Sequence, residues 1–338
     1  QELTAENVAL VGGKNASLGE MMQELMPKGV RIPEGFATTS SAYWHFLEAN
    51  EMKADIQEQL EKLESQEQSL QQTGKAIRRL LWKGDFPQVI QEDILEAYNQ
   101  LSQRYDRDEV DVAVRSSATA EDLPQASFAG QQETFLNVTG EDELLEACKK
   151  CYASLFTDRA ISYRQEQGFD DMKVALSVGI QKMVRADKAG SGVLFTLDTE
   201  TGFPDVVVIN AAWGLGENVV QGLVTPDEYR VFKPLLRQGD YQPILEKQLG
   251  EKEKKMVYVS GGSQTTKNME TSAHERRSYV LSNQEIMQLA RWADTIEKHY
   301  DRPMDIEWAK DGNSEQLFIV QARPETEKKK KEAGALKS

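Results

Sequence analysis

The most informative part of this sequence reads Met304-Asp305-Ile306-Glu307-Trp308, followed after a short gap by Leu317-Phe318-Ile319-Val320-Gln321-Ala322-Arg323. Apolar and polar side chains alternate in both runs, which is typical of a half-buried β-strand. Between the runs lies Lys310-Asp311-Gly312-Asn313-Ser314, which contains an Asp-Gly turn signal. The two runs are therefore predicted to pair as a β-hairpin.

The alternation also predicts which side chains share a face of the hairpin. Alternate apolar residues of the first strand are expected to face a core: Met304, Ile306 and Trp308. Alternate residues of the second strand are expected to lie on one side: Leu317, Ile319, Gln321 and Arg323. The open face would then carry Asp305, Glu307, one amide and one guanidinium, a set of oxygen ligands that suits Mg²⁺ and bound phosphates. A surface hairpin with a salt bridge is the alternative.

Composition excludes several classes of function. The 338 residues are 39% hydrophobic and 28% charged, which is ordinary for a globular protein of two or three domains or lobes. The net charge of −15 repels nucleic acid and anionic membranes, so neither is an expected partner. No apolar run approaches the roughly 20 residues that span a bilayer, and no signal peptide opens the sequence. We expect a cytoplasmic protein.

Cys148 and Cys151 form a C-x-x-C pair in a stretch with a helical pattern. A zinc site would need two further ligands, and no second pair of Cys or His residues lies nearby. The pair is therefore predicted to consist of reduced, partly buried thiols, as in a cytosolic protein.

The remaining pattern predicts a mixture of helices and strands. Residues 50–108 are nearly all helical in pattern, with breaks expected at Gly74, Gly84 and Pro87. Strands are expected around 112–115, 131–138, 174–184, 192–196 and 206–211, and helices over 141–167. Ser282 and Glu285 form a capping box that opens a further helix. Its buried face is predicted to consist of Ile286, Leu289, Ala293 and Ile296.

Two basic residues are candidates for binding an anion. Gly12-Gly13-Lys14 precedes a helix, where backbone N–H groups favour anions, but the spacing is not that of a Walker A loop. A glycine turn with a surface lysine is the alternative. Arg115 ends a strand rich in Val and Ala, and its guanidinium needs an anion or a nearby carboxylate such as Glu121 or Asp122.

Two loops and three histidines complete the candidates. Ser127-Phe128-Ala129-Gly130 forms a small-residue tip that suits a phosphate-covering loop or a plain hairpin turn. Trp213-Gly214-Leu215-Gly216-Glu217 lacks the third glycine of a dinucleotide fingerprint, but its bend could carry Glu217 to a ribose hydroxyl. The three histidines have no adjacent nucleophile and are interpreted as structural: His45, His274 and His299.

Taken together, these motifs resemble one family. The matching segments are Val11-Gly12-Gly13-Lys14-Asn15-Ala16-Ser17-Leu18-Gly19-Glu20-Met21, residues 113–122, residues 126–134, Gly214-Leu215-Gly216-Glu217, residues 303–308 and residues 321–326. They resemble the N-terminal ATP-binding domain of phosphoenolpyruvate synthases, which is shared with pyruvate phosphate dikinase and rifampin phosphotransferase. The resemblance runs from about residue 8 to residue 326.

The resemblance implies an α+β protein with the ATP-grasp fold, in which ATP lies in a nucleotide cleft between two lobes. An N-terminal lobe is expected over residues 1–180, with a helical insertion at about 50–108, and a C-terminal lobe over residues 181–326. Residues 327–338 would form a charged linker or tail.

The resemblance also implies roles for residues at matching positions. The phosphate-binding cations would be Lys14, Arg115 and Arg323, with loop contacts from Gly130 and Thr134. Adenine would contact Gln181, Met183 and Val184, and Glu217 would bind the ribose. Mg²⁺ would be bound by Glu307 and Gln321, supported by Asp305.

Family enzymes of this kind are ATP-dependent phosphotransferases with paired acceptors. A histidine on a separate domain attacks the β-phosphorus of ATP, AMP leaves, and the phosphorylated histidine later phosphorylates pyruvate, which is bound by a third domain. No Thr-Cys-His or Thr-Ser-His motif occurs in this sequence, so this chain alone is expected to lack full activity. A rifampin phosphotransferase-like domain and a nucleotide-binding module without turnover are the alternatives.

Overall fold

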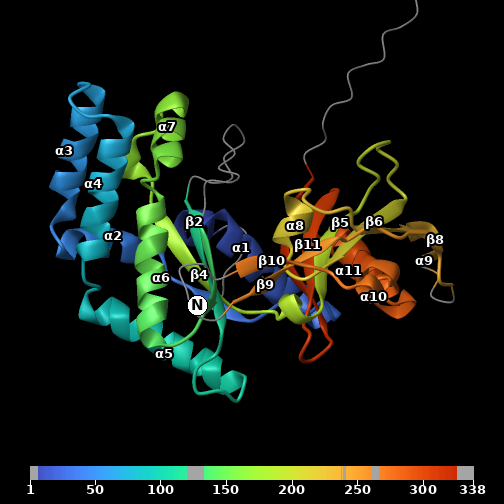
Figure 1. The fold of residues 1–338 in the computed structure, drawn as a ribbon. Helices are drawn as coiled ribbons and strands as arrows, with labels where there is room; N and C mark the ends of the chain where they lie inside the picture. Colours follow the sequence, from blue (N-terminus) through green and yellow to red (C-terminus); the bar gives the residue numbers. More distant parts are fainter. Residues whose placement is uncertain (1–6, 120–132, 237, 239–240, 260–265, 326–338) are drawn as a thin grey trace, which may run out of the picture. The chain divides into compact units, whose positions relative to one another are not determined.

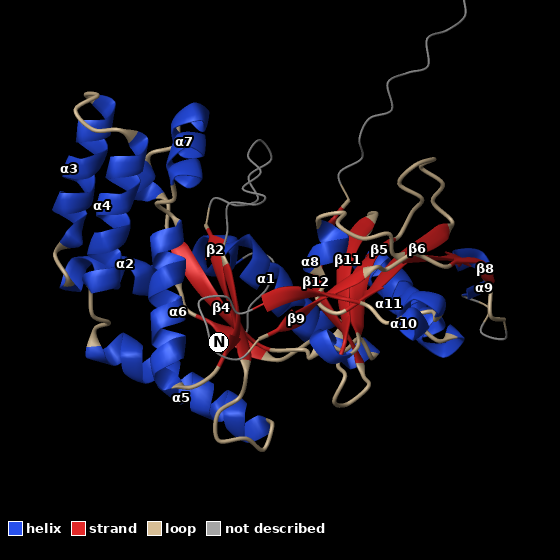
Figure 2. Cartoon of the chain, viewed as in Figure 1, coloured by secondary structure: helices blue, strands red, loops and turns tan. Residues whose placement is uncertain are grey.

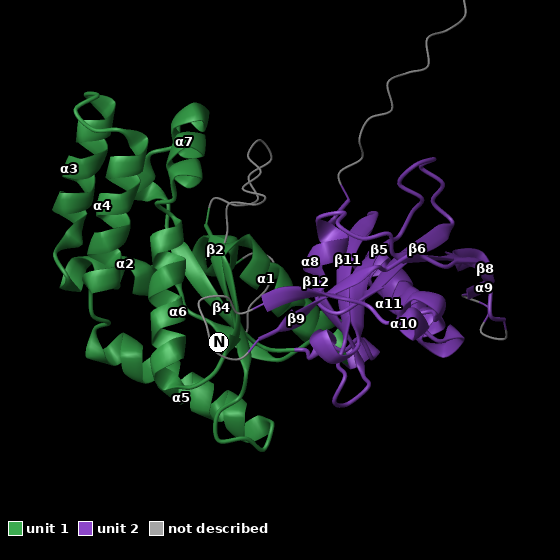
Figure 3. Ribbon diagram, in the orientation of Figure 1, with its two compact units in different colours: residues 1–26, 32–183 green, residues 27–31, 184–338 purple. Residues whose placement is uncertain are grey.

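The structure is a computed structural model that describes residues 7–119, 133–236, 238, 241–259 and 266–325. The chain divides into two compact units, which we describe separately (Figure 3). Unit 1 comprises residues 1–26 and 32–183, and unit 2 comprises residues 27–31 and 184–338. Both contain helices and sheets, so the mixed α+β class predicted from the sequence is confirmed.

Unit 1 contains an antiparallel four-stranded sheet with the order β1-β4-β2-β3 (Figure 2). Its strands are β1 (Gly35–Ala37), β2 (Val112–Ala118), β3 (Thr134–Val138) and β4 (Leu176–Lys182). The central strands β2 and β4 are buried along nearly their whole length, because helices cover both faces of the sheet. Helix α6 (Glu141–Ser154) packs on one face and α1 (Val8–Glu24) on the other.

The stretch over residues 50–108 is helical, as predicted. It forms α3 (Met52–Glu64), α4 (Leu70–Lys83) and α5 (Gln88–Arg104), while α2 (Ser40–Ala49) precedes it and α7 (Asp158–Gln167) packs against α4. The breaks at Gly84 and Pro87 are confirmed, since these residues cap α4 and α5. The break expected at Gly74 is wrong. Gly74 lies inside α4, where a Cβ would stand 3.1 Å from the Phe156 carbonyl oxygen and closer still to two side chains, so the glycine permits close helix packing.

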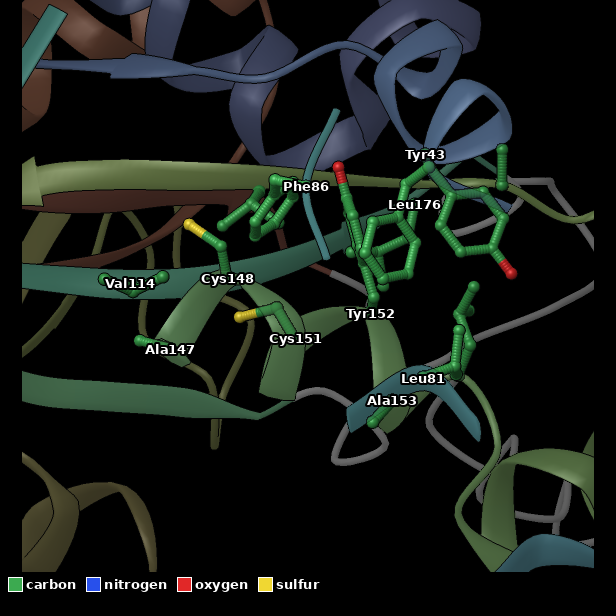
Figure 4. Close-up of a cluster of buried hydrophobic side chains, with 14 of the residues drawn as sticks. Tyr43, Leu81, Phe86, Val114, Ala147, Cys148, Cys151, Tyr152, Ala153 and Leu176 are labelled. Carbon is green, nitrogen blue, oxygen red and sulfur yellow. The ribbon is translucent and has the colours of Figure 1, made fainter. Parts of the chain in front are cut away.

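The core of unit 1 lies between α6, the neighbouring helices and the sheet (Figure 4). Tyr152 of α6 lies edge-on to Tyr43, with ring centroids 5.2 Å apart, and close to Phe46 and Phe86. Cys148 and Cys151 are free thiols, as predicted, but they are fully rather than partly buried. Burial raises the pKa of Cys148 to about 12, which keeps this thiol protonated and unreactive at neutral pH.

Unit 2 contains an antiparallel six-stranded sheet with the order β12-β11-β5-β6-β7-β8 (Figure 1). The strands are β5 (Gly190–Phe195), β6 (Val206–Trp213), β7 (Asp227–Phe232), β8 (Ile244–Gln248), β11 (Met304–Lys310) and β12 (Leu317–Pro324). A separate hairpin pairs β9 (Lys254–Tyr258) with β10 (Thr266–Glu270). The short helices are α8 (Glu217–Val220), α9 (Lys233–Leu236) and α10 (Ala273–Arg277).

The long helix α11 (Asn283–Tyr300) packs on strands β6, β7 and β11 of this sheet. The predicted capping box is confirmed, since the Glu285 N–H donates to Ser282 Oγ at 3.3 Å and the Ser282 N–H donates to Glu285 Oε2 at 2.8 Å. The predicted buried face is also confirmed for all four residues: Ile286, Leu289, Ala293 and Ile296. None of the described helices is long and apolar enough to cross a membrane.

Candidate functional site

The predicted hairpin of residues 304–323 is confirmed as the antiparallel pair β11–β12. Glu307 lies directly opposite Gln321, and Asp305 lies directly opposite Arg323. Met304, Ile306 and Trp308 are each at most 1% exposed, so the apolar side of β11 faces the core as predicted. Directly opposite residues share a face of a sheet, so the four polar side chains lie together on the open face of the hairpin.

The prediction for the second strand is wrong in part. The register shifts at a β-bulge between Glu307 and Trp308, and Ile319 pairs with Trp308 on the buried side. Leu317 is 2% and Ile319 is 0% exposed, whereas Gln321 and Arg323 lie on the open face. One extra residue in β12 changes which side chains face the core, because side-chain direction alternates along a strand.

Arg323 and Asp305 form an ion pair on the open face. Arg323 Nε donates to Asp305 Oδ2 at 2.8 Å, and its terminal nitrogen lies 2.7 Å from the same oxygen. The Asp305 side chain is 11% exposed and that of Arg323 is 53% exposed, so the guanidinium keeps an accessible edge. Burial and the Asp305 charge raise the pKa of the neighbouring Glu325. Arg323 is therefore held by a carboxylate and is open to a second anion.

An apolar patch adjoins the end of this open face that lies beyond Glu307 and Gln321, away from the Asp305–Arg323 ion pair. Ala309 lies two residues beyond Glu307 on β11 and pairs with Phe318 of β12. The patch is formed by the buried residues Val184, Ala186, Leu215 and Ala309 and the half-buried residues Met256, Tyr258, Phe318 and Val320. Of these residues, only Val184 was predicted from the sequence to contact the nucleotide. The four consecutive apolar residues 317–320 were a signal that both faces of this strand are apolar. A strand with one buried face would have an apolar residue only at every second position.

Glu217 begins α8 in unit 2. Gly214 adopts a φ of +83°, and a Cβ there would stand 2.5 Å from the Met256 carbonyl oxygen. This bend lets the Leu215 N–H donate to that oxygen at 3.0 Å, which joins the loop to β9. Glu217 thus lies two residues after Leu215 of the apolar patch.

Lys14 lies on helix α1 and Arg115 on strand β2, and these two elements pack against each other in unit 1. Gly12 has a φ of +75° inside α1, and a Cβ there would stand 2.3 Å from Ser117 Oγ. This kink places Lys14 near the start of the helical segment that follows. Side chains alternate along β2, so Arg115 shares the α1-covered face with Ser117. Thr134 lies directly opposite Arg115 in the sheet.

The predicted adenine contacts lie around the end of β4. Gln181 is 7% exposed, and its Nε2 donates to the Pro33 carbonyl oxygen at 3.1 Å. The Met183 N–H donates to the Asp111 carbonyl oxygen at 2.9 Å within unit 1. Val184 is the next residue and packs in the apolar patch of unit 2. Gly130, the loop around it and the acidic pair Glu121 and Asp122 lie outside the described residues.

The structure therefore presents two partial sites. In unit 2 it brings together the candidates Asp305, Glu307, Gln321 and Arg323, beside the patch that contains Val184. In unit 1, Arg115 and Thr134 lie directly opposite each other, and Lys14 belongs to α1, the helix that packs on this strand. Within the described ranges, no group of three or more His, Cys, Asp or Glu side chains could hold a metal ion. A divalent ion at Glu307 and Gln321 would thus take its remaining oxygen ligands from phosphate or water.

Comparisons with known proteins identify the family of the chain. The family model for the pyruvate phosphate dikinase AMP/ATP-binding domain matches residues 8–338. The chain is 57% identical to phosphoenolpyruvate synthase of Helicobacter pylori, covering 96% of this chain and 41% of the relative. It is 56% identical to the Synechocystis enzyme of that name, covering 100% of this chain and 42% of the relative. A probable phosphoenolpyruvate synthase of Methanocaldococcus jannaschii is 44% identical, covering 97% of this chain and 26% of the relative.

The first two of these relatives extend well beyond the matched region, and the chain spans about two fifths of their length. The matched segment nevertheless includes nearly all of this chain and every residue of both partial sites. The chain belongs to the family of the pyruvate phosphate dikinase AMP/ATP-binding domain.

Proposed function

We propose that this chain is the Mg-ATP-binding domain of a phosphoenolpyruvate synthase and that it has the ATP-grasp fold. The family model names an AMP/ATP-binding domain, and relatives of 57% and 56% identity are named phosphoenolpyruvate synthase. Neither name points to an antibiotic acceptor, so the synthase is favoured over a rifampin phosphotransferase-like enzyme. The cytoplasmic location expected from the sequence is part of the same proposal.

The observation that carries the proposal is the open face of β11–β12. This face changes from an ion pair at Asp305 and Arg323, through Glu307 and Gln321, to the apolar patch around Phe318. A nucleotide has the same order of charged and apolar groups, with charged phosphates at one end and an apolar base at the other. The patch would pack against adenine, and Val184 belongs to it.

Glu307 and Gln321 fit a bound Mg²⁺. A carboxylate and an amide oxygen on directly opposite residues offer two hard oxygen ligands to one ion. The ion would neutralise phosphate charge, as in other phosphoryl-transfer sites. Few protein ligands are needed, because Mg²⁺ commonly takes several of its ligands from phosphates and water.

The remaining candidates would position the nucleotide. Arg323, oriented by Asp305, would donate to one phosphate, and Lys14 and Arg115 of unit 1 would donate to others. Thr134 beside Arg115 and Gly130 would add loop contacts to phosphate. Glu217 would accept from the ribose hydroxyls, and adenine would contact Gln181, Met183 and Val184. Gln181 Nε2 already donates one of its two hydrogens to Pro33, so its second N–H and its carbonyl oxygen would be available to the base.

In the complete enzyme, a histidine on a separate domain would attack the β-phosphorus of the positioned ATP and release AMP. Water would then remove the terminal phosphate, and the remaining phosphoryl group would pass from the histidine to pyruvate to give phosphoenolpyruvate. The phosphohistidine and pyruvate-binding domains are therefore the proposed partners. This chain's own residues would hold the phosphates in line and stabilise the charge that develops during transfer.

Calorimetric titration of Mg-ATP onto the chain tests the proposal. We expect Glu307→Ala and Arg323→Ala each to weaken binding about 10- to 100-fold, because a hydrogen bond to a charged group contributes about 1.5–3 kcal/mol. Arg323→Lys keeps the positive charge but loses the two-nitrogen contact, so it should lie between the wild type and Arg323→Ala.

Matched controls come from exposed residues of the same unit. Glu270→Ala on β10 and Arg291→Ala on α11 should leave the affinity within about twofold of the wild type, since neither lies on the β11–β12 face. Thermal melting would verify that each variant is folded. Unchanged Mg-ATP affinity in folded Glu307→Ala and Arg323→Ala would refute the assignment of the site.

A further inference from the structure

Unit 1 contains an open groove that none of the nucleotide-site candidates lines. Its volume is about 720 Å³, and its walls come from the end of α4, the connection to α5, the start of α5 and the outer side of α6. The lining residues are Trp82, Asp85, Phe86, Gln91, Asp142, Leu145, Glu146, Lys149 and Lys150. A volume of this size suits a small organic molecule.

The floor of the groove is apolar and firmly held. Phe86 is 8% exposed, and its ring centroid lies 5.2 Å from that of Phe46 and 5.9 Å from that of Tyr152. Figure 4 shows Phe86 among the core side chains, near Cys148 of α6. Leu145 adds an aliphatic, half-buried wall. The floor is thus a rigid edge of the unit 1 core.

Trp82 lies at the rim and is 53% exposed. An indole with that much accessible surface can stack on a ligand, and its ring face attracts cations more strongly than any other side chain. The groove therefore offers one apolar floor and one aromatic face.

Both lysines of the groove already have partners. Lys149 Nζ donates to the Gly84 carbonyl oxygen at 3.3 Å. Lys150 Nζ pairs with Glu146 Oε1 at 2.7 Å and lies 6.0 Å from the Phe135 ring centroid. Each ammonium group therefore already donates to an oxygen of unit 1.

The carboxylates of Asp85 and Asp142 are different. Within the part of the chain that the structure describes, no hydrogen bond or ion pair reaches either carboxylate. The contacts of Asp85 are made by its backbone: its N–H donates to Asn50 Oδ1 at 3.0 Å, and its carbonyl oxygen accepts from Asn50 Nδ2 at 2.9 Å. Asp142 lies in the first turn of α6 beside Glu141 and Glu143, so the local field is negative.

We propose that this groove binds a small organic cation, a guanidinium or primary ammonium group on a short alkyl stem. The cationic group would lie between Asp85 and Asp142 and against the Trp82 ring, and the stem would pack on Phe86 and Leu145. An anion is disfavoured because the lining carries three carboxylates against two ammonium groups, both of which already have partners, and the chain carries a net charge of −15. This site is independent of the proposed nucleotide site, since the two share no residue.

Titration of agmatine, which carries a guanidinium and a primary ammonium group at the two ends of a four-carbon stem, tests this inference by two-dimensional NMR of the indole N–H groups. The chain has five tryptophans, and Trp82→Phe identifies the signal of Trp82. We expect the chemical shift of the Trp82 indole N–H to change with increasing agmatine concentration and then to reach a plateau. Asp85→Asn/Asp142→Asn should weaken agmatine binding about fivefold or more, from two exposed charge pairs of up to about 1 kcal/mol each.

Asp93→Asn is the matched control, because Asp93 is exposed on α5 and does not line the groove. It should leave agmatine binding unchanged, and pentanoate, an anion with a similar stem, should not shift the Trp82 signal. The inference is overturned if agmatine gives no saturable shift, if pentanoate shifts the signal equally, or if the double variant binds agmatine like the wild type.

Discussion

At the scale of single residues, the carboxylates of Asp227 and Asp198 join separate segments of unit 2 through hydrogen bonds. Asp227 is fully buried with Lys252, and it also accepts from the Gly250 N–H at 2.9 Å, the Val280 N–H at 2.9 Å and the Tyr229 hydroxyl at 3.0 Å. These contacts join β7 to two loops that are distant in sequence. A buried charge of this kind is stable only when every hydrogen-bonding position is satisfied.

Asp198 has a comparable role near the end of β5. Burial alone would raise the pKa of its carboxyl, but hydrogen bonds from Arg230 and from the Glu200 and Thr201 N–H groups outweigh burial and lower the pKa to about 2. Because this value lies below the ordinary 3.8, the ionised carboxylate stabilises the fold above about pH 4. That stabilisation is lost as the pH falls toward 2.

We therefore predict a pH-dependent effect of Asp198→Asn. The urea midpoint of the variant should lie below that of the wild type at pH 5–7, and the difference should shrink steadily below about pH 4. Asp205→Asn, an exposed residue of the same loop, should show no comparable change with pH. A difference for Asp198→Asn that is as large near pH 2 as at pH 6 would contradict this explanation.

The sequence revealed some of these residues and not others. Glu307 and Asp305 were identifiable because they alternate with buried apolar residues on β11. Asp227 and Lys252 were not, because they lie 25 positions apart and Lys252 sits in a loop with a φ of +42°. Only the folded chain brings such pairs together.

At the scale of elements, helix caps and strand register determine how unit 2 presents its open face. The Ser282–Glu285 capping box begins α11, which packs against β11. Lys310 of β11 also pairs with Glu285 at 2.7 Å. The start of this helix is therefore tied to the strand that carries Glu307.

We predict that Ser282→Ala lowers the free energy of unfolding by about 1 kcal/mol, because the α11 N-terminus loses a side-chain acceptor. Chemical denaturation would measure the change. Thr295→Ala on the same helix is the control, since the Thr295 hydroxyl donates only to the Arg291 carbonyl oxygen, and it should change stability by less than about 0.5 kcal/mol. Equal losses in the two variants would argue against a capping role.

The positions of helices and strands were easier to predict from the sequence than strand register and helix packing. Alternation identified the β11–β12 hairpin, and the S-x-x-E pattern identified the start of α11. The bulge in β12 could not be read from the sequence, because one inserted residue changes the facing of the strand without changing its composition. Gly74 was misjudged for a related reason: α7 packs too closely there for a side chain, and this is a tertiary effect.

At the scale of the whole molecule, unit 1 contains one set of candidate phosphate-binding residues and unit 2 contains another. Burial, alternation and register explain each set separately. The roles of Lys14, Arg115 and Glu217 came from the family resemblance, because no local pattern distinguishes a nucleotide ligand from a structural polar residue.

We predict that the chain alone consumes ATP negligibly. The sequence contains no Thr-Cys-His or Thr-Ser-His motif, which is the acceptor motif expected from the family resemblance. Chromatographic measurement of AMP should give a rate near the uncatalysed background, whereas full-length Helicobacter pylori phosphoenolpyruvate synthase with pyruvate serves as the positive control. Rapid AMP formation by the isolated chain would contradict the proposal that the phosphoryl acceptor lies on a separate domain.

The central claim is that one nucleotide is bound by residues of both units. A crystal structure of the chain with Mg²⁺ and a non-hydrolysable ATP analogue tests it most directly. We predict phosphate contacts from Lys14 and Arg115 together with Arg323, and a metal ion bound by Glu307 and Gln321. A nucleotide bound by only one unit, or one whose phosphates lie away from the β11–β12 face, would contradict the account.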